Sequence, residues 1–334
     1  EIQLGDWSSD VCSSDLAIQL NQVKKGESLL GYLFIKSQTV KTSTNGSRYF
    51  NMTLTDSAFT GMNAKMWDVK PVDEEEFTEG QLVKVKAKVQ EYNGNLQIIV
   101  NRMRLTNEGD PVDINDFVET APVDIEQMYT DLLATIDAFG NADLKKLVGA
   151  MVRDKKSELM YFPAAKRMHH ALKGGLLFHT WSMLRLGKAI APLYPFIDAE
   201  LLYAGIMLHD LGKSVEMLSD ANGSVSDYSA EGKLLGHIIT EVVAIDEYGK
   251  KLGVNPEIVL QLKHMVLAHH YEPEYGSPVR PMFAEAELLH HIDVIDARMN
   301  TMQRIQSETK IGGFSDKVWG LDGIQVYHRP DDAR

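Results

Sequence analysis

The sequence predicts a multidomain α+β protein in which a small β-barrel precedes an all-α domain. Between residues 28 and 105, apolar and polar residues alternate with a period of two, which is typical of half-buried β-strands. From Asp124 onward, apolar residues recur at the spacing of amphipathic helices. Within this second part, histidines and aspartates interrupt the apolar helical runs, and buried polar groups need partners. We therefore expect the second domain to enclose a polar centre.

The overall composition is that of a soluble globular protein. The 334 residues are enough for two domains, and 44% of them are hydrophobic and 24% charged. No apolar run approaches the length of a membrane span, and no secretory h-region opens the chain. We therefore expect a cytoplasmic protein with no membrane partner. The single cysteine, Cys12, excludes an intrachain disulfide and a thiolate metal cluster.

Residues 1–16 are set apart from the predicted domains. Residues 6–16 (DWSSDVCSSDL) resemble the translation of a common sequencing-adapter read, so we expect residues 1–16 to be a non-native tail. The alternative is a natural disordered tail rich in serine and aspartate. Neither alternative gives the tail a function.

A five-stranded barrel is predicted for residues 17–108. The strand candidates are residues 29–40, 48–56, 61–69, 81–92 and 96–105, and Asn93-Gly94 is a strong hairpin signal. Five short strands in a domain of this size suit an OB-type barrel, which binds single strands by stacking bases on aromatic side chains along a basic groove. The candidate nucleic-acid-binding residues are Tyr32, Phe34, Lys36, Arg48, Tyr49, Lys65 and Trp67.

Strand alternation limits how many of these aromatic residues can face a ligand. In a barrel about half of the strand aromatics point into the core, so only one of Tyr49 and Phe50 is expected outside. By the same argument, Trp67 is either a core residue or a stacking platform. The sequence therefore predicts nucleic-acid binding for the barrel as a whole more firmly than for any single residue in it.

The charge distribution favours a nucleic-acid partner for the barrel, although the net charge of the chain is −13. Residues 17–110 carry a net charge of +1, whereas residues 1–16 carry −4 and the remainder carries −10. Acidic residues of the barrel cluster in residues 73–79 (DEEEFTE), which leaves the rest of its surface locally basic. A single-stranded nucleic acid is therefore the expected partner of the barrel.

The helical part begins after a short connection. Residues 109–123, with two prolines, are expected to link the domains. Asp124 is predicted to begin one amphipathic helix, and Asn141 to cap another. We assign the all-α domain to residues 124–310 and leave residues 311–334 as a C-terminal tail.

The doublet His209-Asp210, inside the apolar helical run of residues 201–213, is the centre of a predicted metal site. A single histidine on an apolar helix face is more often a satisfied core residue than a metal ligand. Here the same insertion recurs along one domain, at His179, His237, His269-His270 and Asp293. One shared metal centre would satisfy all of these polar groups and would activate water against phosphate esters.

The segments GGLLFHT (174–180) and HDLGK (209–213) resemble motifs of the HD-domain metallophosphohydrolase superfamily. The resemblance implies two divalent ions bridged by Asp210. It implies that one ion is held by His179, His209, Asp210 and Asp293, and the other by Asp210, His237 and His269. Mixed nitrogen and oxygen ligands favour Mn²⁺ and leave Mg²⁺, Co²⁺ and Fe²⁺ open.

The candidate catalytic residues are Asp210 and Lys213. Lys213 lies one helical turn beyond His209, so its ammonium group would meet the scissile phosphate. The alternative is a lysine that is favoured at this position only by the helix dipole.

Further polar residues are left uncertain or in supporting roles, namely His170, His264, His270 and Asp296. Adjacent residues on a helix point about 100° apart, so we expect only one member of the His269-His270 pair to face the site. Asp296 follows Asp293 by about one helical turn and would either orient a ligand or pair with Arg298 or Arg304.

The order of a barrel, a short linker and an HD domain resembles the YhaM family of 3′-to-5′ exoribonucleases. The segments that carry this resemblance are RYFNMTLTD (48–56), HHALKGGLLFHT (169–180), LLYAGIMLHDLGK (201–213), GKLLGHI (232–238), LAHHYEPEYGSP (267–278) and AELLHHIDVIDARM (286–299). The resemblance implies metal-dependent removal of nucleotides from the 3′ end of single-stranded RNA, with single-stranded DNA as a further substrate class. A homo-oligomer is left open.

Two other functions remain open at the level of sequence. The first is an HD hydrolase of nucleotides or cyclic dinucleotides, in which the barrel is regulatory. The second is a non-enzymatic RNA-binding protein with an inactive HD domain, which the complete set of ligand residues argues against.

Overall fold

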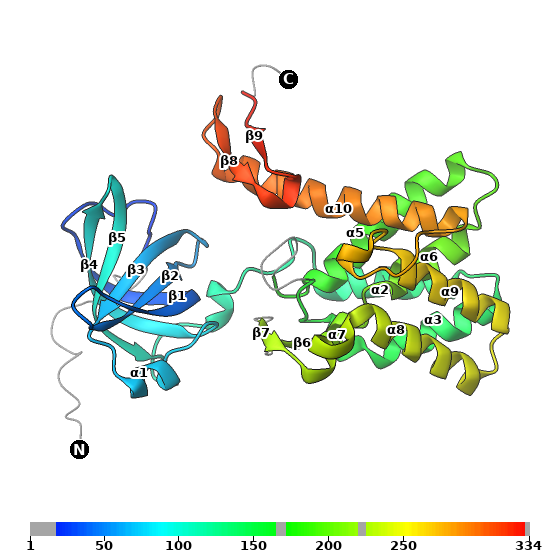
Figure 1. Cartoon of the computed structure of the whole chain (residues 1–334), viewed down its shortest axis with the longest axis horizontal. Coiled ribbons are helices and arrows are strands. Elements are labelled where there is room, and N and C mark those ends of the chain that lie inside the picture. The colour runs from blue at the N-terminus through cyan, green and yellow to red at the C-terminus, as the bar shows by residue number, and fades with distance from the viewer. Residues whose placement is uncertain (1–17, 165–171, 220–224, 331–334) are drawn as a thin grey trace. The chain divides into compact units, whose positions relative to one another are not determined.

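The computed structural model describes residues 18–164, 172–219 and 225–330. These residues form two compact units, the first ending at Glu119 and the second beginning at Thr120 (Figure 1). The predicted tail (residues 1–16, with Cys12) and His170 lie outside the described residues. Within the described ranges, no helix combines the length and the apolar character that a bilayer crossing requires.

The first unit is a closed five-stranded barrel, as predicted. Its strands are β1 (Ser28–Thr42), β2 (Arg48–Thr55), β3 (Gly61–Trp67), β4 (Leu82–Tyr92) and β5 (Asn95–Leu105), and a short helix, α1 (Pro71–Glu76), lies between β3 and β4. The strands close in the order β1-β2-β3-β5-β4. All neighbouring pairs are antiparallel except β3 and β5, which are parallel. The OB-type barrel is therefore confirmed.

The inward-facing strand residues fill the barrel. Leu33 and Ile35 of β1, together with Phe50 of β2, are fully buried in its core. Because successive side chains of a strand point to opposite faces, Tyr49 is only half-buried beside the buried Phe50. This is the outcome that alternation predicts for the pair.

A strap (residues 107–118) covers one outer face of the barrel. It contains a short 3₁₀ helix, η1 (Ile114–Phe117), and its Phe117 and Val118 pack against Tyr32 and Phe34. The first part of the segment that was expected to link the domains therefore packs on the barrel. The sequence prediction missed this because prolines indicate an irregular backbone and not what that backbone covers.

A buried carboxylate ties the strap to the barrel. Asp110 accepts hydrogen bonds from the Tyr32 hydroxyl at 2.7 Å and from both terminal nitrogens of Arg104 at 2.7 Å. The backbone N–H of Asn107 donates to the same carboxylate at 2.9 Å. The hydrogen bonds from Arg104 hold the pKa of Asp110 far below its ordinary value, despite burial. Burial and the hydrogen bond to Asp110 raise the pKa of Tyr32 to about 12.

The second unit is a helical bundle with one extended hydrophobic core. Its helices are α2 (Ile125–Asp137), α3 (Ala142–Asp154), α4 (Lys156–Leu159), α5 (Gly175–Ile190), α6 (Ala199–Leu208), α7 (Lys213–Glu216), α8 (Ala230–Leu252), α9 (Pro256–Ala268) and α10 (Ala284–Glu308). The predicted caps are present: the Asp124 side chain accepts from Gln127 N–H, and that of Asn141 accepts from Asp143 and Leu144 N–H.

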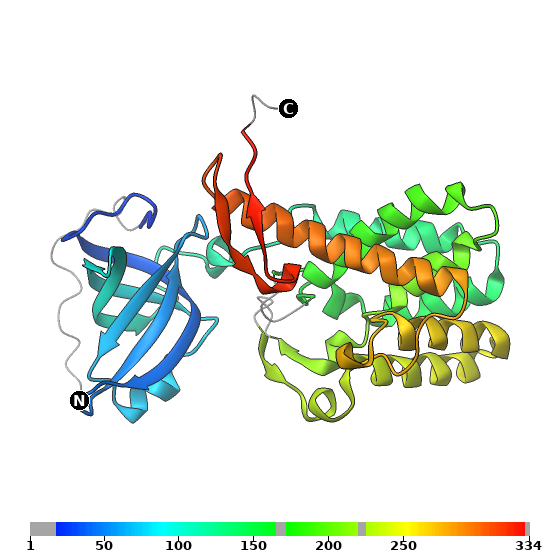
Figure 2. The same cartoon turned by 45° about the horizontal axis from the view of Figure 1, so that its top comes forward.

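Two hairpins depart from a purely helical second unit. The first pairs β6 (Met217–Ser219) with β7 (Val225–Tyr228) directly after α7. The second pairs β8 (Phe314–Val318) with β9 (Ile324–Tyr327), joined by the 3₁₀ helix η4 (Trp319–Leu321). Residues 314–327, which were expected to be part of a tail, form this hairpin at the end of α10 (Figure 2). Arg298 of α10 pairs with Asp322 at 2.7 Å.

We predict that Asp110→Asn destabilises the barrel by about 1–3 kcal/mol near neutral pH, because the bonds from Arg104 and Tyr32 lose their charged acceptor. The pKa of Asp110 is lowered in the folded state, so its contribution is present above the unfolded value of about 3.9. It is lost as the pH falls further toward the folded value. Amide hydrogen exchange in β1 and β4 of the full chain, corrected for the intrinsic rate at each pH, measures the effect.

The matched control is Glu91→Gln, which removes an exposed ion pair with Lys25 and should cost at most about 1 kcal/mol. Equal effects of the two substitutions at neutral pH would contradict the role given to Asp110.

Candidate metal centre and nucleic-acid interface

Five helices bring imidazole and carboxylate groups to one place in the second unit. His179 lies on α5, His237 on α8 and Asp293 on α10, while His209-Asp210 directly follows α6 and His269-His270 directly follows α9. His179, His209 and His269 are fully buried. These groups come from sequence positions far apart, so the cluster is a product of helix packing.

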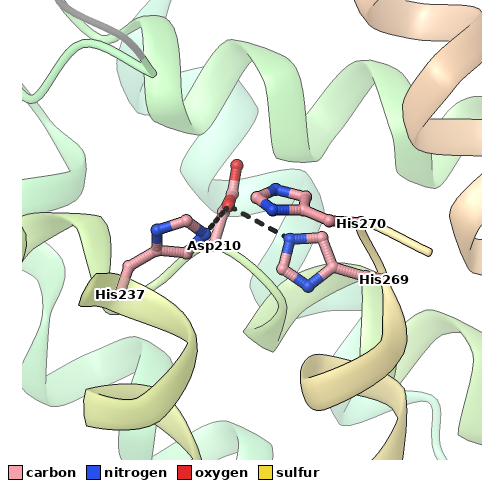
Figure 3. Close-up of side chains that lie close together, drawn as sticks. All are labelled: Asp210, His237, His269 and His270. Carbon is pink, nitrogen blue, oxygen red and sulfur yellow. Dashed lines mark ion pairs between the residues drawn. The ribbon is translucent and has the colours of Figure 1, made fainter. Parts of the chain in front are cut away.

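Asp210 lies at the centre of the cluster (Figure 3). Its Oδ2 atom is 3.6 Å from His179 Nε2 and 3.3 Å from His209 Nε2. Its Oδ1 atom is 3.4 Å from His237 Nε2 and 3.8 Å from His269 Nε2. Each carboxylate oxygen therefore faces a different pair of imidazoles, which is the arrangement of a carboxylate that bridges two cations.

The remaining ring nitrogens fix which atom of each imidazole faces Asp210. His209 Nδ1 bonds to the carbonyl oxygen of Ile206 at 2.9 Å, and His269 Nδ1 to that of Val266 at 2.6 Å. His237 Nδ1 bonds to Glu216 at 3.0 Å. Carbonyl and carboxylate oxygens only accept, so Nδ1 carries the proton and Nε2 keeps a lone pair for a metal.

The buried atoms of the cluster fit a divalent cation. Among the described residues, the Nε2 atoms of His209, His237 and His269 and the Oδ1 atom of Asp210 are buried with no hydrogen-bond partner. Such atoms cost free energy in an apolar interior unless something satisfies them. A divalent cation at this point would satisfy them together, and nitrogen with oxygen is a donor set that such ions accept.

The charges around Asp210 depend strongly on one another. Burial by itself would raise the pKa of Asp210, but Lys213 and His209 hold it well below its ordinary value. Burial by itself would lower the pKa of His179, but hydrogen bonds to Asp293 and Asp296 raise it to about 10. Burial and the neighbouring imidazoles lower the pKa of His269, which favours the neutral ring that a metal needs.

His270 also belongs to the cluster, contrary to the expectation that only one member of the pair faces the site. One ligand atom each of Asp210, His237, His269 and His270 lies within 4.8 Å of the others (Figure 3). The reason is local: α9 ends at Ala268, and Tyr271 has a positive φ of 69°. The pair therefore lies in the turn that directly follows α9.

Two carboxylates orient the imidazoles from behind. Asp296 Oδ2 lies 2.8 Å from His179 Nδ1, which is the contact that orienting this imidazole requires. Glu216, at the end of α7, holds His237 in the same way, and the bond to His237 keeps the pKa of Glu216 low despite burial. Sequence reasoning missed Glu216, because only the fold brings it beside His237.

The other uncertain histidine has a different role. His264 Nε2 accepts the backbone N–H of Met282 at 3.0 Å, and its ring contacts Phe283. His264 therefore holds the segment before α10 and is not part of the cluster.

Lys213 is the cation at the edge of the cluster. Its Nζ atom is 2.7 Å from Asp210 Oδ2, and 13% of its side chain is exposed. The structure therefore places its ammonium between the buried carboxylate and solvent.

Two glycines allow the chain to approach the cluster closely. Gly236, with a φ of 71°, breaks the helical path of α8 one residue before His237. A Cβ atom at Gly212 would lie 2.5 Å from the carbonyl oxygen of His237, a distance that a side chain cannot adopt. The glycine of the HDLGK segment is therefore needed for the contact between the His209-Asp210 turn and α8.

The barrel carries an aromatic surface that is open to solvent. Tyr49 and Trp67 pair across β2 and β3, with ring centroids 4.5 Å apart. The Lys65 ammonium lies 5.9 Å from each of these rings and 5.1 Å from the ring of Tyr92. Trp67 is 44% exposed and Tyr92 is 58% exposed. We call Tyr49, Lys65, Trp67 and Tyr92 the aromatic platform.

The other predicted binding residues of the barrel do not belong to the aromatic platform. Tyr32 and Phe34 are buried beneath the strap, so the prediction that they stack bases is wrong. Both point out of the barrel core, as predicted for a platform, but the strap fills that face. Arg48 is exposed but pairs with Glu74 at 2.7 Å, and Lys36 is exposed. Tyr92 was not predicted, because it lies at a hairpin end where alternation gives no direction.

Comparisons with known proteins identify both units. Residues 176–298 match the HD domain family, and residues 36–106 match the OB-fold nucleic acid binding domain family. A solved structure, the second OB-fold domain of replication protein A from Methanococcus maripaludis, aligns with 29% of this chain and 98% of its own. The identity is 12% and the TM-score is 0.22.

Curated relatives cover nearly the whole chain. The 3′-5′ exoribonuclease YhaM of Geobacillus sp. (strain WCH70) is 39% identical over 90% of this chain and 92% of its own. YhaM of Listeria monocytogenes serotype 4b (strain CLIP80459) is 39% identical over 91% of this chain and 96% of its own. YhaM of Listeria innocua serovar 6a is 38% identical over the same shares.

The fold and the cluster define a class of protein, namely an HD-domain hydrolase joined to an OB-fold nucleic-acid-binding domain. The similarity over nine-tenths of the chain then settles the family. The chain belongs to the YhaM family of 3′-5′ exoribonucleases.

We predict that Glu216→Met, which keeps the side-chain volume but removes the acceptor for His237 Nδ1, weakens metal binding roughly 10–100-fold. Manganese titration of the metal-stripped full chain, followed by calorimetry, measures the change. The control is Glu231→Met on the exposed first turn of α8, which should bind manganese like the unchanged protein. Unaltered affinity in Glu216→Met would mean that this carboxylate does not orient a ligand.

Proposed function

We propose that this protein is a metal-dependent 3′-5′ exoribonuclease that hydrolyses single-stranded RNA with activated water. The observation that carries the proposal is the convergence of buried imidazole Nε2 atoms on Asp210, in a chain that also has an OB-fold barrel. A phosphodiesterase needs a site for cations and a surface for the polymer. The two units supply one each.

The metal ligands are assigned from the geometry of the cluster. His179, His209, Asp210 and Asp293 form one set, in which His179 Nε2 is 3.2 Å from Asp293 Oδ1. Asp210, His237, His269 and His270 form the second set. Bound divalent ions supply Lewis acidity, which lowers the pKa of water and polarises the phosphate.

The side chains do the remaining work. The neutral imidazoles keep their Nε2 lone pairs toward the centre because their Nδ1 protons are held by acceptors. The ammonium of Lys213 pairs with Asp210 on one side and keeps some exposure to solvent. We infer that it donates to a phosphate oxygen and offsets the negative charge of the transition state. Burial of the cluster excludes bulk water, which strengthens these charge interactions.

The aromatic platform is the proposed polymer-binding surface. Tyr49 and Trp67 offer rings on which successive bases stack, and Lys65 and Lys36 offer positive charge to the backbone. Each stacked base contributes about 1–3 kcal/mol, whatever its identity. The platform therefore holds single-stranded RNA without requiring a particular base sequence.

The finer assignments follow from chemistry. Two ions fit the two ligand sets that share Asp210, and Mn²⁺ is the ion that we favour for a site of nitrogen and oxygen donors. Stacking does not depend on a 2′-hydroxyl, so single-stranded DNA is proposed as a secondary substrate.

The two alternative functions are not favoured. A hydrolase of small nucleotides has no need of a platform with two adjacent exposed aromatic rings and a lysine. A non-enzymatic RNA-binding protein has no need of a buried cluster whose Nε2 atoms are oriented inward. Relatives named as exoribonucleases also match both units of the chain.

We expect manganese-loaded protein to shorten 5′-labelled RNA stepwise and to release the label of 3′-labelled RNA at once as a mononucleotide. Asp210→Ala should give no product above background with either RNA, because the carboxylate shared by both ligand sets is lost. Gel electrophoresis of the products, with Mn²⁺, Mg²⁺, Co²⁺ and Fe²⁺ compared after chelation, measures both outcomes. Early release of mononucleotide from the 5′ label would contradict the proposed direction.

We expect Trp67→Ala to raise KM for an oligoribonucleotide roughly 5–150-fold, the equivalent of one stacked base. Hydrolysis of bis(4-nitrophenyl) phosphate, which has no run of bases to stack on the platform, should be unchanged. Deletion of residues 17–110 should show the same contrast in stronger form. Phe59→Ala is the control, because Phe59 is 41% exposed on the same barrel but outside the platform. Parallel loss of both activities in Trp67→Ala would refute the division of labour.

A further inference from the structure

The helical unit contains a second cleft that the metal centre does not use. The cleft lies among α2, α5 and α6 and has a volume of about 730 Å³. Ligand pockets for small molecules span roughly 300–1,000 Å³, so the cleft is large enough for one. Its lining includes Phe139, Trp181 and Tyr203. These aromatic residues give it a wall suited to a planar ring.

The cleft lies away from the metal centre along the same helices. His179 is in the first turns of α5, whereas Arg185 and Lys188 of the cleft are in its last turns. His209 follows the end of α6, whereas Glu200 and Tyr203 of the cleft are near its beginning. The charged residues Arg185, Lys188 and Glu200 of the cleft therefore lie toward the ends of α5 and α6 that are away from His179 and His209, and these two helices pack against each other.

The carboxylates of the cleft are already engaged by N–H donors. Asp131 accepts from the Trp181 indole at 2.8 Å and from the Gln127 side chain at 2.8 Å. Glu200 accepts from the backbone N–H groups of Gly140 and Asn141 at 2.7 and 2.9 Å. Among the described residues, neither carboxylate forms a direct ion pair with Arg185 or Lys188, so both cations are free to contact a ligand although the four charges of the lining balance.

Two cations occupy one face of α5 at the cleft. Arg185 and Lys188 are separated by three positions, so their side chains project to the same side of the helix. The Arg185 guanidinium lies 4.6 Å from the Trp181 ring centre, and Lys188 donates to the Thr135 hydroxyl at 2.7 Å. Both residues are exposed, and within the described ranges neither is paired with a carboxylate. They form a site for an anion such as a phosphate.

We propose that this cleft binds a nucleoside monophosphate. The phosphate lies between Arg185 and Lys188, and the base lies against the wall of Trp181 and Tyr203. The carboxylates of Asp131 and Glu200 keep lone pairs that can accept from ribose hydroxyls. Among the described residues, nothing bonds to the Tyr203 hydroxyl, which leaves a donor for the ligand.

The choice of a monophosphate rests on the proposed function, because stepwise RNA hydrolysis releases nucleoside monophosphates. Binding at the cleft does not require turnover, however. It can therefore be tested in protein that has lost the metal centre, and failure of the cleft is distinguishable from failure of the exonuclease.

The test uses the full chain with Asp210→Ala, stripped of metal by a chelator, and equilibrium dialysis with radiolabelled adenosine 5′-monophosphate. We expect saturable binding that becomes roughly tenfold or more weaker when Arg185→Gln and Lys188→Gln are added, because two charge-assisted contacts are lost. Tyr203→Phe, which removes a single hydroxyl, should weaken binding less. Adenosine alone and inorganic phosphate alone should each compete more weakly than the nucleotide.

Lys250→Gln with Lys251→Gln is the matched control, because it removes the same charge from exposed positions of α8. It should leave the affinity unchanged, and circular dichroism checks that all variants are folded. No saturable binding, or binding that is equally strong in the Arg185 and Lys188 variant, would overturn the proposal. Competition by inorganic phosphate as strong as that by the nucleotide would overturn the assignment of a nucleoside ligand.

Discussion

A buried carboxylate encircled by imidazoles is the constraint around which the helical unit is built. Asp210 is 3% exposed, and several imidazole nitrogens lie within 4 Å of its two oxygens. Removing such an ion from water costs several kcal/mol unless opposite charge and hydrogen bonds compensate. Five helices must keep their relative positions for this compensation to hold. A change in the packing of one of them would leave buried polar atoms unsatisfied.

The ends of the helices supply the orientation of the rings. His209 and His269 are the residues that cap α6 and α9, and each bonds through Nδ1 to a carbonyl oxygen three residues earlier. The last carbonyl groups of a helix have no partner within the helix, so an imidazole at this position satisfies one of them. The same bond turns Nε2 toward Asp210. The Nδ1 hydrogen bond thus satisfies a carbonyl group at the helix end and also fixes the direction of Nε2.

The barrel shows how one fold separates structural from binding aromatics. Phe50 points into the core, Tyr32 and Phe34 point outward but are covered by the strap, and Tyr49 and Trp67 form an adjacent, accessible pair of rings. The Asp110 network holds the strap in place through Tyr32 and Arg104. The strap therefore decides which outward-facing rings stay accessible to solvent, and it covers Tyr32 and Phe34 but not the rings on β2 and β3.

The periodicity and the order of residues in the sequence were enough to predict most of the strands, several helix starts and the polar residues of the cluster. Alternation with a period of two predicted the five strands, and Asp124 and Asn141 marked the starts of helices that the structure contains. These signals are local, because a strand or a helix end depends on residues within a few positions of it. The set of histidines and aspartates was also visible, since buried polar groups in apolar helices call for a shared partner.

Only the tertiary structure decided what lies next to these elements. The burial of Tyr32 and Phe34 depends on a strap that lies far from them in sequence, and the contact of Glu216 with His237 depends on how α7 meets α8. His270 joins the cluster because the chain leaves the helix at Ala268, a boundary that the apolar pattern does not mark. Propensity acts between neighbours along the chain, whereas burial and ligand geometry arise between segments that meet only when the chain has folded.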